Sequence, residues 1–160
     1  MRFLQLFSLM EGNNRNYLLD DIRYGGNEIF LPKWENFLSI QAANVAASSG
    51  RIQVLEYILS KGWTPTTEGA NEAASNGHVQ VLEILKKHDV LPDIIGLIRA
   101  ARNGHVDSLE WMENNGIKPN EEVPFLVASH RTYAGIEGRK KTLQWLESRG
   151  FPYKNIVGKC

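Results

Sequence analysis

The chain has 160 residues, of which 42% are hydrophobic and 22% are charged; this composition is typical of one globular domain and not of a disordered chain. The 18 basic and 18 acidic residues give a formal net charge of zero, which argues against a dedicated nucleic-acid or membrane-surface binder. The charge is uneven, because residues 131–160 hold seven Lys or Arg and two acids, a net +5, whereas residues 1–130 carry −5.

The cysteine content and the hydropathy pattern predict an intracellular protein that is not secreted. Cys160 is the only cysteine, so no intrachain disulfide can form. Gln5 and Ser8 interrupt the apolar start "MRFLQLFSLM", and no small-residue cleavage site follows, which favours an amphipathic helix over a signal peptide. No apolar run approaches the roughly eighteen residues that a membrane span needs.

Residues 1–35 do not match the rest of the chain, and we expect them to form an N-terminal helical cap. The stretches "FLQLFSLM" (3–10) and "YLLDDIRY" (17–24) each predict a helix. The following stretch "LPKWENFLSIQAANVAA" (31–47) predicts a lengthened helix that leads into a repeated region.

The repeated region is defined by glycines at a fixed spacing. Gly50, Gly77 and Gly104 are 27 residues apart, and each follows an alanine pair and precedes a similar apolar pattern: "GRIQVLEYILSKG", "GHVQVLEILKKHD" and "GHVDSLEWMENNG". A fourth copy, "GRKKTLQWLESRG", begins at Gly138 after a step of 34, which indicates about seven inserted residues near 131–137. We therefore predict repeat units over 36–62, 63–89, 90–116 and 117–150, a remnant over 151–160, and one structural domain in all.

Each unit predicts two short antiparallel helices. The first opens after a proline or a polar cap and ends at the turn glycine, which tolerates the left-handed conformation. The second has apolar residues at helical spacing and closes at Gly62, Asp89, Gly116 or Gly150. The alanine pairs allow neighbouring helices to approach closely. One unit cannot bury its apolar face alone, so stacking must supply the core.

The stretches "AASNGHVQVLEIL" and "AARNGHVDSLEWM" resemble the ankyrin repeat, and the resemblance covers roughly residues 36–155. The period is 27 rather than 33, and the Thr-Pro-Leu-His opening of that family is absent. Such short repeats are similar to those of large DNA viruses of protists and of protists themselves. The resemblance implies an all-α, ankyrin-like helical solenoid of about four helix-turn-helix repeats behind the N-terminal cap. It also implies that His78 and His105 lie in the turns and bond backbone of the neighbouring unit.

The sequence holds no catalytic or metal-binding pattern that would favour an enzyme. His78 and His105 occupy equivalent repeat positions with no Cys or acid at ligand spacing, and nucleophile-elbow, zincin and phosphate-loop motifs are missing. We expect no catalysis, no cofactor, no metal and no small-molecule substrate. Tyr57, Ile84, Trp111 and Trp145 share one position of the second helix. We expect them to pack between adjacent second helices; a peptide-binding stripe is the alternative.

Candidate partner-binding residues lie next to the alanine pairs of the first helices, where resembling proteins bind partners along a concave face. They are Glu72, Ser75, Arg99, Arg102 and His130. Arg99 and Arg102 could fork onto a partner carboxylate, and reversing both charges would then abolish binding with little effect on stability. The alternative is a solvated polar face with an exposed Glu72–Arg99 pair.

The inserted stretch "RTYAGIEGRKK" (131–141) departs from the repeat and predicts a loop whose Arg139, Lys140 and Lys141 could meet an acidic partner or phosphate. A solvated loop that aids solubility is the alternative. The favoured function is a non-catalytic protein–protein interaction module, such as an adaptor or a host-factor-binding protein. One alternative is a structural component of a larger assembly such as a virion. Another is a ubiquitin-ligase substrate adaptor that docks through "LPKWENFLSI" (31–40). We expect a protein partner, no nucleic acid or membrane, and a monomer or weak self-association through the repeat ends.

Overall fold

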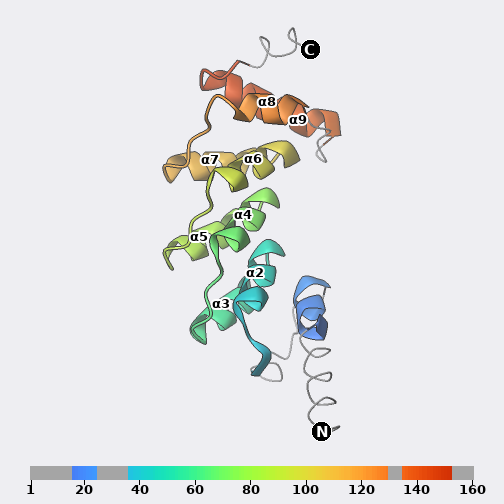
Figure 1. Ribbon diagram of the computed structural model, residues 1–160, viewed down its shortest axis with the longest axis vertical. Helices are drawn as coiled ribbons and strands as arrows, with labels where there is room; N and C mark the ends of the chain where they lie inside the picture. The colour runs from blue at the N-terminus through green and yellow to red at the C-terminus, as the bar shows by residue number, and fades with distance from the viewer. Residues whose placement is uncertain (1–15, 25–35, 130–134, 153–160) are drawn as a thin grey trace, which may run out of the picture.

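The computed structural model describes residues 16–24, 36–129 and 135–152, and all the regular secondary structure in these ranges is helical (Figure 1). A helix over 16–24 comes first. The helices that follow are α2 (Ile40–Ser48), α3 (Ile52–Ser60), α4 (Thr67–Ser75), α5 (Val79–Lys86), α6 (Ile94–Asn103), α7 (Val106–Asn114), α8 (Val123–Ser129) and α9 (Gly135–Ser148). The predicted all-α class is confirmed for this part of the chain. None of these helices is long and apolar enough to cross a membrane.

The helices pack as consecutive pairs in chain order. A short turn reverses the chain within the pairs α2–α3, α4–α5 and α6–α7, and α8 packs on α9. The first helices of successive pairs contact one another, α2 with α4, α4 with α6 and α6 with α8. Figure 1 shows the pairs placed one after another along the longest axis, with α2, α4 and α6 on one side and α3, α5 and α7 on the other.

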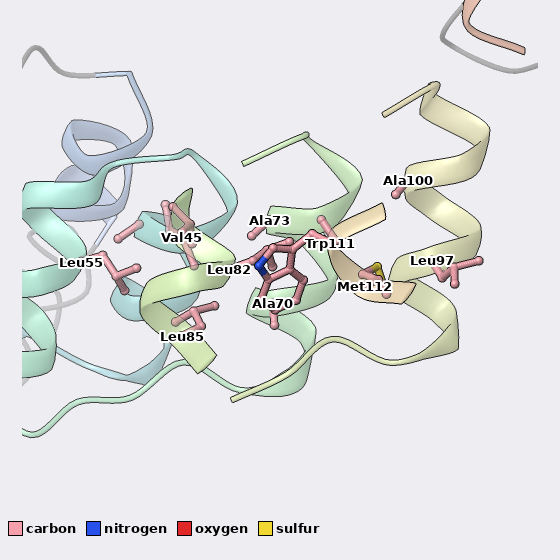
Figure 2. Close-up of a cluster of buried hydrophobic side chains, with 14 of the residues drawn as sticks. Val45, Leu55, Ala70, Ala73, Leu82, Leu85, Leu97, Ala100, Trp111 and Met112 are labelled. Carbon is pink, nitrogen blue, oxygen red and sulfur yellow. The ribbon is translucent and has the colours of Figure 1, made fainter. Parts of the chain in front are cut away.

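The core runs between the pairs and depends on small side chains. Each of the first helices α2, α4 and α6 places two adjacent, fully buried alanines against its neighbours: Ala46 and Ala47, Ala73 and Ala74, Ala100 and Ala101. Larger side chains of the second helices fill the remaining space, including Leu55, Leu82, Leu85 and Met112 (Figure 2). Since alanine keeps the helix axes close, the short helices can bury apolar surface that no single pair could cover.

Glycines end the helices as predicted. Gly50, Gly77 and Gly104 have positive φ angles of 69°, 79° and 80°. At each of them the next backbone N–H reaches a carbonyl five residues back, as from His78 to Ala73 at 2.9 Å, which satisfies an otherwise unpaired helix-end carbonyl. The second helices close in the same way at Gly62, Gly116 and Gly150, and at Asp89, whose φ is 59°.

Helix starts agree with the predicted caps in part. The Asp93 carboxylate accepts a hydrogen bond from the Ile95 amide at 2.8 Å, and Asn120 accepts one from the Glu122 amide. The predicted lengthened helix over 31–47 is wrong within the described residues. The Ser39 hydroxyl accepts a hydrogen bond from the Ala42 amide, and α2 begins only at Ile40, because a serine in extended conformation is a strong helix start.

The fourth unit departs from the predicted turn. Gly138 was expected to end a first helix, as Gly104 does, but it lies inside α9, which is 14 residues long where α7 has 9. The predicted loop over 131–141 is therefore wrong from Gly135 onward. From Thr142 to Gly150 the burial pattern of α9 again matches that of α7, with Leu143, Trp145 and Leu146 buried.

Several predictions fall on residues outside the described ranges. These are the helix over 3–10, most of the N-terminal cap over 1–35, His130, the residues 131–134 of the insertion and most of the remnant over 151–160. The predicted helix over 17–24 lies inside the described part and is confirmed, with Leu18 and Ile22 buried in the core.

Candidate functional site

The repeated Asn-Gly-His letters join neighbouring pairs through their turns. The Asn76 side-chain amide donates a hydrogen bond to the Ser48 carbonyl at 2.8 Å, and Asn103 donates to the Ser75 carbonyl at 2.9 Å. His78 lies against Gly50, where an added Cβ would be 2.8 Å from the ring, and His105 lies against Gly77 in the same way. These three letters therefore form an architectural joint that recurs from pair to pair.

His78 also shows the electrostatic consequence of this joint. Burial disfavours its charged form and lowers its pKa, and the nearby His105 lowers it further, while a hydrogen bond to the Ser48 backbone acts in the opposite direction. The histidine thus bonds the backbone of the preceding pair, as the resemblance implied for this position.

A second joint, which sequence reasoning missed, links the middle of each first helix to the start of the next. The Asn44 side-chain oxygen accepts a hydrogen bond from the Thr66 amide at 2.8 Å, and one unit later Asn71 accepts one from the Asp93 amide at 2.9 Å. Gly69 and Gly96 make room, since an added Cβ would meet the asparagine oxygen at 2.5 Å in both cases. The next unit has Ile98 and Val123 at the corresponding positions. The asparagine and the glycine of this joint are therefore both absent from that unit. Asparagine and glycine recur with the same spacing of 27 in the earlier units, and this shared spacing could have revealed the joint from the sequence.

With these positions assigned to architecture, three further positions of each first helix remain, and most of their side chains are accessible, although Val45 and Ser75 are buried. The first position is exposed in all four units and holds Gln41, Glu68, Ile95 and Glu122, the last of which directly precedes α8. The second holds Val45, Glu72, Arg99 and Leu126, and the third includes Ser48, Ser75 and Arg102. We call this set the first-helix face. Its residue types change from unit to unit, whereas the alanine pair beside them recurs in α2, α4 and α6.

Arg99 is engaged on this face by two carboxylates of the preceding helix. Its Nη1 donates to Glu68 Oε1 at 2.7 Å and also to Glu72 Oε1. The hydrogen bond to Glu68 raises the pKa of Arg99 above its usual value. All three side chains are more than a third exposed, so water screens the contact and it contributes at most about 1 kcal/mol. The Glu72–Arg99 pair anticipated from the sequence exists, with Glu68 as an additional partner.

The other candidates on the face differ in accessibility. Ser75 is only 6% exposed and its hydroxyl accepts a hydrogen bond from Asn103 at 3.0 Å, so it serves the joint between pairs. Arg102 is partly exposed and has no ion pair within the described part of the chain. Ile95, seven residues earlier and thus on the same side of α6, is 46% exposed. Arg102 and Ile95 are therefore the accessible charge and the accessible apolar side chain of this helix.

The aromatic position of the second helices is structural. Trp111 and Trp145 are buried, and Tyr57 and Ile84 pack partly buried against the core. The Trp111 indole N–H donates to Glu83 Oε1 of the preceding second helix at 2.6 Å. The Arg149 guanidinium lies 4.1 Å from the ring centroid of Trp145 and donates to Glu113 at 2.7 Å. The expectation that each of these side chains covers its neighbour is confirmed for Trp111.

The basic run of the fourth unit is helical where the structure describes it. Lys140 and Lys141 are exposed on the N-terminal half of α9. The Arg139 backbone lies in the same helix, and its side chain lies outside the described part, as does His130. The helix packs on α6, α7 and α8, so the two lysines occupy fixed backbone positions.

No protein family, curated protein or solved structure matches this chain. Among the residues that the structure describes, no three His, Cys, Asp or Glu side chains gather in a geometry that could hold a metal ion. The geometry of the first-helix face is thus the observation on which a functional proposal can rest.

Proposed function

We propose that this chain is an ankyrin-like solenoid that acts as a non-catalytic protein-binding module through its first-helix face. The repeated joints support the solenoid arrangement, because they attach the first pair to the second and the second pair to the third by the same atoms. One observation carries the functional part of the proposal. Ile95 and Arg102 lie on one side of α6, and neither is used by the scaffold. An exposed apolar side chain on the same helix side as an arginine that has no ion pair within the described residues is a common centre of a protein interface.

The structure also changes the variant that should test this face. Reversing Arg99 together with Arg102 would place three carboxylates together, because Glu68 and Glu72 already lie against Arg99. Such a variant would lose stability as well as any contact. Ile95→Ser with Arg102→Glu changes the accessible side chains and leaves the cluster around Arg99 in place.

The test is quantitative affinity purification with mass spectrometry of the tagged chain and its variants. The expected result is that Ile95→Ser/Arg102→Glu loses specific partners at least tenfold with an unchanged melting temperature. The matched control is Gln53→Ser/Lys87→Glu, which changes one exposed uncharged residue and one exposed cation on second helices, and it should retain the same partners. Equal partner lists for the two double variants would reject the first-helix face.

A further inference from the structure

One edge of the molecule is formed by the turns between first and second helices. Arg51, His78 and His105 stand at the same position of these turns, directly before α3, α5 and α7. In the fourth unit the corresponding sequence position is Arg139, since Trp111 and Trp145 fix an offset of 34 between α7 and α9. Every unit therefore has arginine or histidine at this position. We call this surface the turn edge.

A hollow of about 380 Å³ opens on the turn edge and spans three units. Gly50 and Gly77 border it, and the rings of His78 and His105 lie against these two glycines. Ile52 and Val79 supply apolar lining, and His78 and Asp107 add polar groups. The hollow has room for an apolar side chain of a partner and lies along the edge, so an extended chain could follow it.

The electrostatics of this edge favour carboxylates. The helices α3, α5 and α7 all begin here, and no side chain of their N-cap residues caps them, so their N-terminal amides add partial positive charge. The Arg51 Nε is buried and has no hydrogen-bond partner within the described residues. Lys140 and Lys141 stand in α9 where α3 has Ile52 and Gln53, and both are exposed.

The acids at the same edge are fewer than the cations. Asp107 lines the hollow, and Glu137 lies in the first turn of α9. Against these two carboxylates stand Arg51 and the two lysines, besides the helix ends. The balance is positive on a chain whose first 130 residues have a net charge of −5.

We infer that the turn edge binds an extended acidic segment of a partner protein, with an apolar side chain in the hollow and carboxylates toward Arg51 and the Lys140–Lys141 pair. Nucleic acid fits less well, because the apolar lining of the hollow suits a leucine-like side chain and offers no cation to a phosphate. Helix pairs are stacked at roughly 10 Å, so four units span roughly 30 Å and match about nine extended residues.

The test uses the full chain and a fluorescein-labelled ten-residue peptide of glutamates with one central leucine, followed by fluorescence anisotropy at low salt. Lys140→Glu/Lys141→Glu should weaken binding at least tenfold. The control Lys86→Glu/Lys87→Glu makes the same charge change on an exposed pair at the opposite end of α5, and it should weaken binding less than threefold. Arg102→Glu on the first-helix face should leave this binding unchanged.

Three results would overturn the inference. The wild-type chain could fail to bind the peptide, or the two double variants could lose affinity equally, which would indicate only a general charge effect. A single-stranded oligonucleotide of ten residues that binds more tightly than the peptide would replace the acidic segment by nucleic acid.

The role of the hollow is tested separately. A peptide of glutamates without the leucine should bind at least threefold more weakly than the leucine-containing peptide. Equal binding of the two peptides would show that the hollow is not part of the site.

Discussion

At the scale of single residues, the turn glycines adopt a left-handed backbone conformation, and some of them also leave room for a side chain of the next unit. Substitutions can separate these two effects. Gly77 has a φ of 79°, and an added Cβ would lie 2.6 Å from His105. Gly116 has a φ of 87° with nothing within 4 Å. Backbone strain affects both positions, whereas the contact with the next unit affects only Gly77.

Gly77→Ala should therefore destabilise the protein more than Gly116→Ala. The left-handed backbone costs about 1 kcal/mol for either alanine, and displacement of the His105 ring adds about 1–2 kcal/mol at Gly77. Equilibrium urea unfolding measures both. An equal loss in the two variants would show that the contact between Gly77 and His105 does not hold the pairs together.

The lowered pKa of His78 makes stability depend on pH. Its pKa in the folded chain is below the ordinary value of 6.5, so the unfolded chain binds a proton more readily as the pH falls through 6.5. The contribution of neutral His78 to the free energy of unfolding is therefore present above pH 6.5, and it is lost as the pH falls from 6.5 toward the lower pKa of the folded chain. His78→Gln should reduce the fall in melting temperature between pH 7.5 and pH 5.5.

The matched control is His88→Gln, which changes an exposed histidine and should leave that pH dependence unchanged. If His78→Gln melts with the same pH dependence as the wild-type chain, the buried joint does not control this response.

Single residues also show which features of the structure could be predicted from the sequence. The glycine ends and the alanine pairs were predictable because backbone conformation and close packing admit few other residues. The link from Asn71 to Asp93 was not, since an asparagine in mid-helix usually points to solvent. The contact of Arg99 with Glu72 was the alternative to partner binding in the sequence analysis, and its second contact, with Glu68, depends on side-chain reach that spacing alone does not give.

At the scale of helices, α9 is the element that the repeat pattern described least well. Glycine within a helix costs about 1 kcal/mol relative to alanine, so Gly138 favoured a turn. The contacts of α9 with α6, α7 and α8 offset this cost. A period of 27 predicts what recurs. It cannot predict whether added residues form a loop or lengthen a helix.

The buried side of α9 contains a polar group that α3 and α5 lack and that α7 has as Ser108. Thr142 is fully buried and its hydroxyl has no hydrogen-bond partner among the described residues, whereas the corresponding residues of α3 and α5 are Val54 and Val81. Thr142→Val keeps the shape and removes the unsatisfied group, so it should stabilise the protein by about 1 kcal/mol. Thr67→Val, at an exposed position, is the control and should change stability by less than about 0.5 kcal/mol. A destabilised Thr142→Val variant would mean that the hydroxyl is satisfied.

At the scale of the whole molecule, the scaffold joints and the accessible side chains of the first-helix face are different residues. The joints between pairs use asparagines, histidines and glycines that recur at the repeat spacing. The first-helix face uses positions whose residue types change from unit to unit. Because the side chains of Ile95 and Arg102 take no part in these joints, a variant at these two positions can alter binding without altering the stack, and this makes the proposed function testable.

The most direct test of protein binding by the first-helix face is site-specific photocrosslinking from within that face. A photoreactive phenylalanine analogue would replace Ile95, which is 46% exposed on α6, or Glu110, which is exposed on the second helix α7. Each variant would be expressed with a tag, irradiated in cells and resolved by mass. The account predicts a discrete protein adduct from position 95 and none from position 110. Adducts from position 110 alone, or the same adducts from both positions, would contradict it.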